Sequence, residues 1–165
     1  MRTTETEHLS SVFGLKRTAE VNWEKGIEAA YQGFVFISPP VDGWTFVVST
    51  NFAQSRIEKI TQKAASMLQK LSSAFGEAQF YATHRVVELH IWAKALNGRL
   101  IRAHGYIGES GEIFWDEGKA EVPEVDIRSD INEETVMEMA RTWSISPTDL
   151  DQYKSKPSLG LVGEL

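Results

Sequence analysis

Two neighbouring stretches of this chain, Arg85–Ala95 and Arg99–Ile107, alternate apolar and polar side chains almost without interruption. Side chains along a β-strand point to opposite faces in turn, so this alternation predicts two strands with one apolar and one polar face. Asn97-Gly98 lies between the stretches and is a strong hairpin signal. The predicted apolar face carries Val87, Leu89, Ile91, Ala93, Ile101 and Ala103. The predicted polar face carries Glu88, His90, Trp92, Lys94, Arg102, His104 and Tyr106.

The length of the turn decides which residues face one another. A two-residue turn at Asn97-Gly98 would pair Ile91 with His104 and mix the two faces. A three-residue loop, Leu96-Asn97-Gly98, keeps the faces separate, and we therefore predict that loop. The cross-strand pairs that follow are Val87–Ile107, Leu89–Gly105, Ile91–Ala103, Ala93–Ile101, Glu88–Tyr106, His90–His104 and Trp92–Arg102.

The same reasoning at Glu109-Ser110-Gly111 adds a further strand over Glu112–Glu117. It predicts the pairs Ile107–Ile113, Gly105–Trp115, Tyr106–Phe114 and His104–Asp116. We therefore expect His90, His104 and Asp116 to lie in one row across three strands.

The rest of the chain supplies helices and a further hairpin. Apolar residues at three- and four-residue steps predict a helix over Ala53–Phe75 and another over Asn132–Trp143, and Phe34–Ser38 with Trp44–Thr50 reads as a hairpin. Runs of strands beside a few helices favour an α+β fold, with an antiparallel sheet of five to six strands, a long helix packed on one face and shorter helices at both ends. The length of 165 residues predicts a single domain, 1–165, with 1–18 as a loosely attached arm and 154–165 as a loosely attached tail.

Composition narrows the classes of function. The chain has a formal net charge of −6, which disfavours nucleic acid and suits a basic protein partner. It has no cysteine, no signal peptide at its start and no apolar run long enough for a membrane span, so we expect a cytoplasmic protein that does not bind membranes. An exposed apolar edge strand would also allow a homodimer.

The polar face is the candidate binding face, and it lacks the signs of a catalytic site. His84, His90 and His104 could bind a metal with Asp116 or Glu88, but no ligand-spacing motif supports one, and we predict neither a metal nor a cofactor. His104 beside Asp116 resembles a base with its orienting acid, but no nucleophile accompanies them, so we assign no catalytic residue. Trp92 and Arg102 would form either a partner-binding cation–π pair or a structural pair under the N-terminal arm. The candidate face comprises Glu88, His90, Trp92, Arg102, His104, Tyr106 and Asp116.

Several short motifs resemble a family of small bacterial proteins. The resemblance covers roughly residues 20–150 and is carried by Gly43–Val48, Phe75-Gly76-Glu77, Tyr81–Val87, Asn97–Ala103 and Trp115–Gly118. These segments resemble the single-domain immunity proteins that accompany secreted polymorphic toxins. The resemblance implies a cytosolic, acidic and catalytically inert protein that neutralises a cognate toxin by covering it, and it implies no catalytic residue.

Two hypotheses follow. The first is a non-catalytic cytosolic binding protein, an immunity protein whose polar face and acidic edges bind a basic toxin. The alternative is a small enzyme or ligand-binding domain that uses His90, His104 and Asp116 on the polar face.

Overall fold

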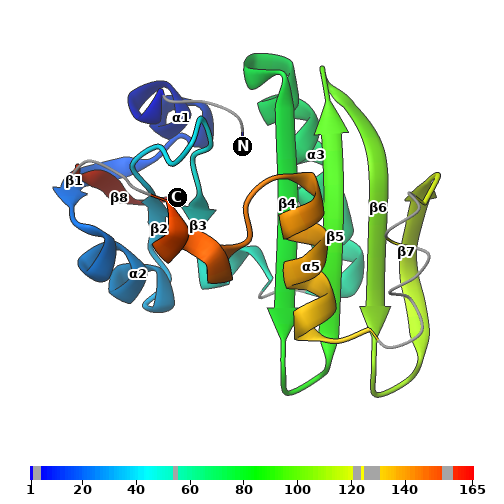
Figure 1. Ribbon diagram of the computed structural model, residues 1–165. Helices are drawn as coiled ribbons and strands as arrows, with labels where there is room; N and C mark the ends of the chain where they lie inside the picture. The colour runs from blue at the N-terminus through cyan, green and yellow to red at the C-terminus, as the bar shows by residue number, and fades with distance from the viewer. Residues whose placement is uncertain (2–4, 54–55, 121–123, 125–130, 154–157) are drawn as a thin grey trace. The chain divides into compact units, whose positions relative to one another are not determined.

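The computed structural model of the chain describes residues 1, 5–53, 56–120, 124, 131–153 and 158–165. The chain divides into two compact units, one formed by residues 1–55 with 153–165 and the other by residues 56–152, where the sequence predicted a single domain. The described strands form two antiparallel four-stranded sheets, one in each unit (Figure 1). The α+β class is confirmed, but the prediction of a single sheet of five to six strands is wrong.

The first unit is built from both ends of the chain. Its sheet has the strand order β1-β8-β2-β3, and β8 pairs with both of its neighbours, for example Leu161 with Ile37 and Val162 with Ala19. The elements are α1 (Thr6–Phe13), β1 (Lys16–Val21), α2 (Trp23–Tyr31), β2 (Val35–Ile37), β3 (Val47–Val48), the 3-10 turn η1 (Thr50–Phe52) and β8 (Gly160–Glu164).

The predicted loose arm and tail are therefore parts of this unit. Leu9 of α1 is fully buried, and β8 is an interior strand of the sheet. The glycines of β8 make its sequence look unlike that of a strand. Close packing against β2 nevertheless requires a glycine at position 160. A Cβ atom on Gly160 would lie 2.3 Å from the backbone oxygen of Ile37, so no larger residue fits there. Residues 2–4 of the arm and 154–157 of the tail lie outside the described part of the chain.

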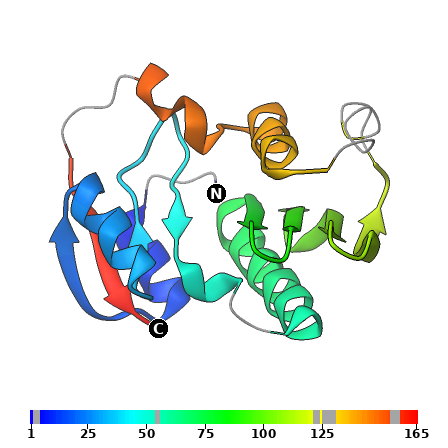
Figure 2. The same cartoon turned by 90° about the horizontal axis from the view of Figure 1, so that it is seen from below.

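The second unit is a four-stranded meander in the order β4-β5-β6-β7, with a helix on each face of the sheet (Figure 2). The helix α3 packs on β4, β5 and β6, while α5 packs on β4 and β5. The unit contains α3 (Ile57–Phe75), β4 (Glu77–His84), β5 (Leu89–Leu96), β6 (Arg99–Ile107), β7 (Glu112–Gly118), α5 (Glu133–Trp143) and the 3-10 turn η2 (Pro147–Gln152).

The face under α3 is the apolar core that the alternation predicted. The apolar stripe of α3 buries Ile60, Ala64, Leu68 and Leu71 against Ile91, Ala93, Ala103 and their neighbours. The helix begins at Ile57 rather than at Ala53, and Gly76 ends it. Two residues predicted on this face lie elsewhere. Val87 belongs to the β4–β5 turn and Ile101 lies at a bulge, and their side chains are 42% and 40% exposed.

The hairpin between β5 and β6 differs from the prediction in its turn. Leu96 pairs directly with Arg99, so Asn97-Gly98 is a two-residue turn, and both residues have positive φ, 47° and 80°, as a type I′ turn requires. A β-bulge follows, because Lys94 pairs with Arg102 and Ala95 with Leu100, which leaves Ile101 as the extra residue. The extra residue restores the separation of the two faces, which the prediction achieved with a longer loop.

The register of β5 and β6 is consequently shifted by two residues from the predicted one. The predicted pairs His90–His104 and Trp92–Arg102 are wrong, as are Glu88–Tyr106 and the apolar pairs. The observed pairs are Leu89–Ile107, His90–Tyr106, Ile91–Gly105, Trp92–His104, Ala93–Ala103 and Lys94–Arg102.

A second bulge separates the correct from the incorrect pairs between β6 and β7. The predicted pairs Gly105–Trp115 and His104–Asp116 are confirmed. Phe114 is the extra residue, so Tyr106 pairs with Ile113 and Ile107 with Glu112, which corrects the predicted pairs Tyr106–Phe114 and Ile107–Ile113.

Candidate functional site

The polar face of the second unit brings together a row that differs from the predicted one by one residue. Tyr81, Trp92, His104 and Asp116 are consecutive partners on β4, β5, β6 and β7. His90 does not join His104, because its partners across the sheet are Thr83 and Tyr106. The face therefore has no row of two histidines and an aspartate.

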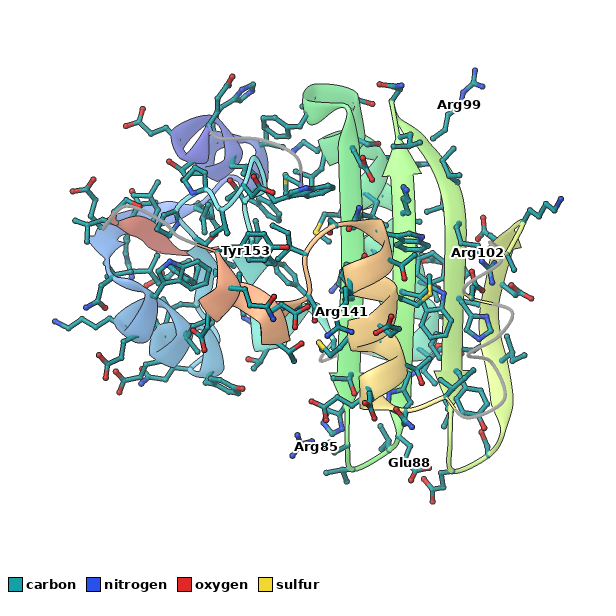
Figure 3. The ribbon with its side chains drawn as sticks, in the orientation of Figure 1. Arg85, Glu88, Arg99, Arg102, Arg141 and Tyr153 are labelled. Atoms are coloured by element: carbon teal, nitrogen blue, oxygen red, sulfur yellow. The ribbon has the colours of Figure 1, made fainter. Side chains whose placement is uncertain are left out.

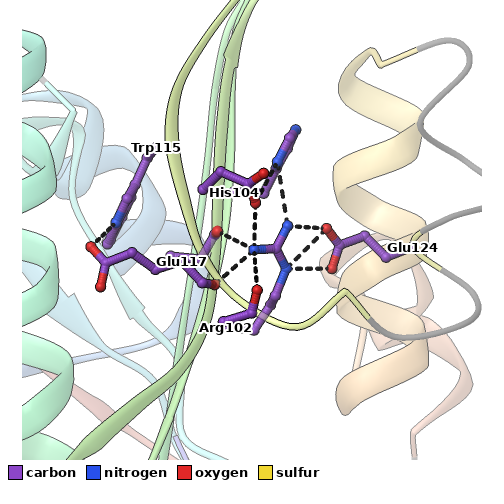
Figure 4. Close-up of polar contacts among 8 residues, drawn as sticks. Arg102, His104, Trp115, Glu117 and Glu124 are labelled. Carbon is purple, nitrogen blue, oxygen red and sulfur yellow. Dashed lines mark hydrogen bonds and ion pairs between the residues drawn. The ribbon is translucent and has the colours of Figure 1, made fainter.

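Arg102 is the centre of this face, and its guanidinium group is completely surrounded by acceptors (Figure 4). Its Nε donates to both carboxylate oxygens of Glu124, at 3.0 and 2.7 Å, and its Nη2 donates to Glu124 as well. Its Nη1 lies 2.7 Å from Asp116 Oδ1 and 2.7 Å from the backbone oxygens of Ala103 and Glu117. The side chains of Arg102 and Glu124 are 1% and 0% exposed, so this ion pair is excluded from water.

The two carboxylates hold the arginine charged despite its burial. Burial by itself lowers the pKa of the Arg102 guanidinium, and the hydrogen bonds and charges of Glu124 and Asp116 outweigh it, so that the pKa is raised. Asp116 lies at the edge of the cluster with 47% of its side chain exposed. The cluster is thus a buried cation with one buried and one solvated counter-ion.

His104 lies beside this ion pair and is closed off from solvent. Its ring is fully buried and stacks on Trp92, with ring centroids 4.6 Å apart. Its Nδ1 lies 3.4 Å from Arg102 Nη2 and 3.7 Å from Asp116 Oδ1. A guanidinium group can only donate, so Arg102 directs an N–H at Nδ1, the nitrogen that would have to donate to Asp116 in a pair of base and orienting acid. This arrangement holds the imidazole in place rather than activating it.

The helix α5 covers much of the polar face. Trp92 is fully buried in an apolar cluster with Val136, Met139 and Trp143 of that helix. Of the seven residues of the predicted binding face, His90, Trp92, Arg102 and His104 are buried. Only Glu88 and Asp116 are exposed, with Tyr106 partly so. The polar face is therefore an interior layer rather than a flat surface for a partner. Lys94, and not Trp92, pairs with Arg102 across β5 and β6, so the predicted Trp92–Arg102 pair is not formed.

His90 occupies a separate polar position nearer the β4–β5 turn. Its Nδ1 lies 3.2 Å from the hydroxyl of Thr83. Burial lowers the pKa of His90, and the charges of Glu88 and Glu133 oppose this only partly. At neutral pH His90 is therefore an uncharged, hydrogen-bonded side chain under the start of α5.

Glu124 is the residue of this buried ion pair that the sequence did not predict. It lies in the acidic part of the sequence between β7 and α5. A possible signal was Arg102 itself, since an arginine on a strand that packs under a helix needs an acidic partner. Several acids follow β7, however, and spacing does not show which one reaches the arginine.

The described residues hold no further site with a metal-binding or membrane signature. No three histidine, cysteine, aspartate or glutamate side chains among them are grouped so as to hold a metal ion. No helix in the described ranges combines the length and apolar character that crossing a membrane requires.

Comparison with protein-family models, curated proteins and solved structures gave no match.

Proposed function

We propose that this protein is a non-catalytic cytosolic binding protein that acts by direct contact with a basic protein, as an immunity protein acts on its toxin. The observation that carries the proposal is the state of Arg102. Its donors are directed at Glu124, Asp116, His104 and backbone oxygens, which supports a role of these side chains in stabilising the fold rather than in a reaction. The charge of −6 supports a basic partner.

The alternative, an enzyme or ligand-binding domain, needs His90, His104 and Asp116 to meet at an accessible place. His104 is fully buried, and His90 faces Thr83 and Tyr106 instead of His104. These contacts favour the binding protein over the enzyme.

The experiment that tests this proposal measures how much toxin activity remains at each molar ratio of the chain to the toxin. The chain and a basic toxin of the native host are purified separately, and residual toxin activity is measured as the chain is added. A binding protein inhibits fully near a 1:1 molar ratio, whereas an enzyme that inactivates the toxin acts at a small fraction of that ratio. Protection far below equimolar amounts, or its loss in His104→Gln with the fold intact, would establish the alternative. Failure of affinity capture from the native host to yield any basic protein would reject the proposal.

A further inference from the structure

The turn between β4 and β5 presents two valines to solvent side by side. The turn comprises Arg85–Glu88, and the side chains of Val86 and Val87 are 84% and 42% exposed. Turns ordinarily carry glycine, asparagine, aspartate or proline, whereas valine favours strands and buried positions. Val86 therefore gains little from folding of this unit alone, and Val87 is only partly buried by it.

The turn is held in place from two sides. On one side, the backbone oxygen of Glu88 accepts a hydrogen bond of 2.9 Å from the Gly108 amide of the next turn, and Glu88 has a φ of 48°, a strained value for a residue other than glycine. On the other, Arg85 Nε donates to Glu133 Oε2 of α5 at 2.7 Å. Figure 3 shows Arg85 and Glu88 together at one end of the sheet. The backbone hydrogen bond from Gly108 to Glu88 therefore anchors the turn that carries the valines, which lowers the entropy cost of docking.

Acidic side chains surround this end of the sheet. Glu88, Glu109 and Glu112 are exposed, and residues 105–118 include no lysine or arginine. The nearby Arg85 is already bonded to Glu133. This end of the sheet thus combines an apolar tip with negatively charged neighbours. We call it the end surface, and it comprises Val86, Val87, Glu88, Glu109 and Glu112.

We infer that the end surface is the docking surface for a basic protein, which receives the two valines in an apolar pocket bordered by lysine or arginine. The inference rests on the proposed function and names the surface that carries it out. Charge complementarity selects this occupant. A second copy of the chain would bring the same acids against this surface, and nucleic acid or an anionic membrane would be repelled by them.

Site-specific photo-crosslinking tests the surface in the native host. A benzophenone amino acid replaces Val86 in one variant, Val87 in another and Ile101 in a control. Ile101 is a matched control because it is also an exposed apolar residue of this unit, and it lies near Arg99, at the opposite end of the sheet from Arg85 and Glu88 in Figure 3. We expect a covalent adduct with a protein of basic isoelectric point at positions 86 and 87 and none at 101.

Each other outcome contradicts the inference in a distinguishable way. An adduct at 101 with none at 86 or 87 would reject the end surface and leave the proposed function standing. An adduct with a second copy, an acidic protein or lipid would reject the basic partner. No adduct at any position, together with no basic protein in affinity capture, would reject the surface and the proposed function together.

Affinity measurements on the identified complex give the size of the effect. Val86→Ser with Val87→Ser should weaken binding at least about tenfold, because two buried valines are lost from the interface. Glu109→Lys should weaken it about fivefold and more at low salt than at high salt. The controls Ile101→Ser and Glu134→Lys, the latter an exposed acid on α5, should each change the dissociation constant less than about twofold. Equal losses in the variants and the controls would contradict a specific surface.

Discussion

Arg102 and Glu124 form a buried ion pair in which the arginine Nε contacts both carboxylate oxygens, at 3.0 and 2.7 Å, across 22 residues of sequence. The pair joins β6 to Glu124, which precedes α5 in the sequence. Burying such an ion pair costs free energy of desolvation. Once it is buried, removing one partner leaves an unpaired buried charge, which strongly destabilises the folded state.

Removal of the Glu124 charge should destabilise the second unit. In Glu124→Gln the guanidinium group stays buried with only the half-exposed Asp116 as a counter-ion, and we expect a loss of about 3 kcal/mol in the free energy of unfolding. Denaturant unfolding followed by tryptophan fluorescence measures the loss. The exposed Glu134 supplies the control, since Glu134→Gln should change stability by less than about 0.5 kcal/mol.

Removal of both charges together should cost less than removal of either one. The double variant Arg102→Met with Glu124→Leu replaces the pair by apolar groups of similar size, and it should be more stable than Arg102→Met or Glu124→Leu alone. A double variant whose loss equals the sum of the single losses would show that the two side chains are not coupled.

Gly118 should be among the positions of the second unit least tolerant of substitution. Its φ is 78°, and a Cβ atom there would lie 1.9 Å from the backbone oxygen of Ile101. Gly118→Ala should therefore cost clearly more than the about 1 kcal/mol of strain expected from positive φ alone. Gly111→Ala is the matched control, because Gly111 has a φ of 69° and open space around its Cβ position. Equal unfolding free energies for the two variants would contradict the close approach of β7 to β6.

Acid should destabilise the chain through His90. Burial lowers the pKa of His90 in the folded state below the ordinary value of 6.5, so the unfolded chain binds more protons as the pH falls past that value. The contribution of His90 to stability is complete above this pH and is lost as the pH falls from there toward the folded-state pKa. His90→Asn should unfold with a shallower pH dependence between about pH 7 and 5. A slope in His90→Asn equal to that of the unsubstituted chain would oppose this assignment.

The His104 ring should carry its proton on Nε2. Arg102 Nη2 lies 3.4 Å from His104 Nδ1, and since the guanidinium group only donates, Nδ1 must accept. Long-range proton–nitrogen NMR spectra distinguish the two tautomers. Signals of the Nδ1-protonated ring at neutral pH would mean that His104 donates to Asp116 instead, as a catalytic base would.

The two faces of the central hairpin were predictable from sequence, but its register was not. Alternation alone places Ile91 and Ala93 on the apolar face, and a shift by an even number of residues leaves that face unchanged. The bulge at Ile101 could not be predicted, because a bulge residue has no distinctive side chain. The alternation of apolar and polar residues is the same for a longer loop as for a short turn followed by a bulge.

The candidate site was predictable only within a single hairpin. His104 and Asp116 lie on adjacent strands joined by a short turn, so local spacing was enough to pair them. Glu124 depends on how the segment after β7 reaches Arg102, and the burial of Trp92 depends on α5, which follows later in the chain. Such contacts depend on tertiary packing rather than on any sequence period.

The place of β8 in the first sheet has a consequence for the order of events during synthesis. Because Gly160–Glu164 pairs with β1 and β2, that sheet lacks an interior strand until these residues have been translated. The second unit, by contrast, is encoded by one continuous segment and can form as soon as residue 152 has left the exit tunnel. The sheet of the first unit therefore receives its interior strand only after every residue of the second unit has been translated.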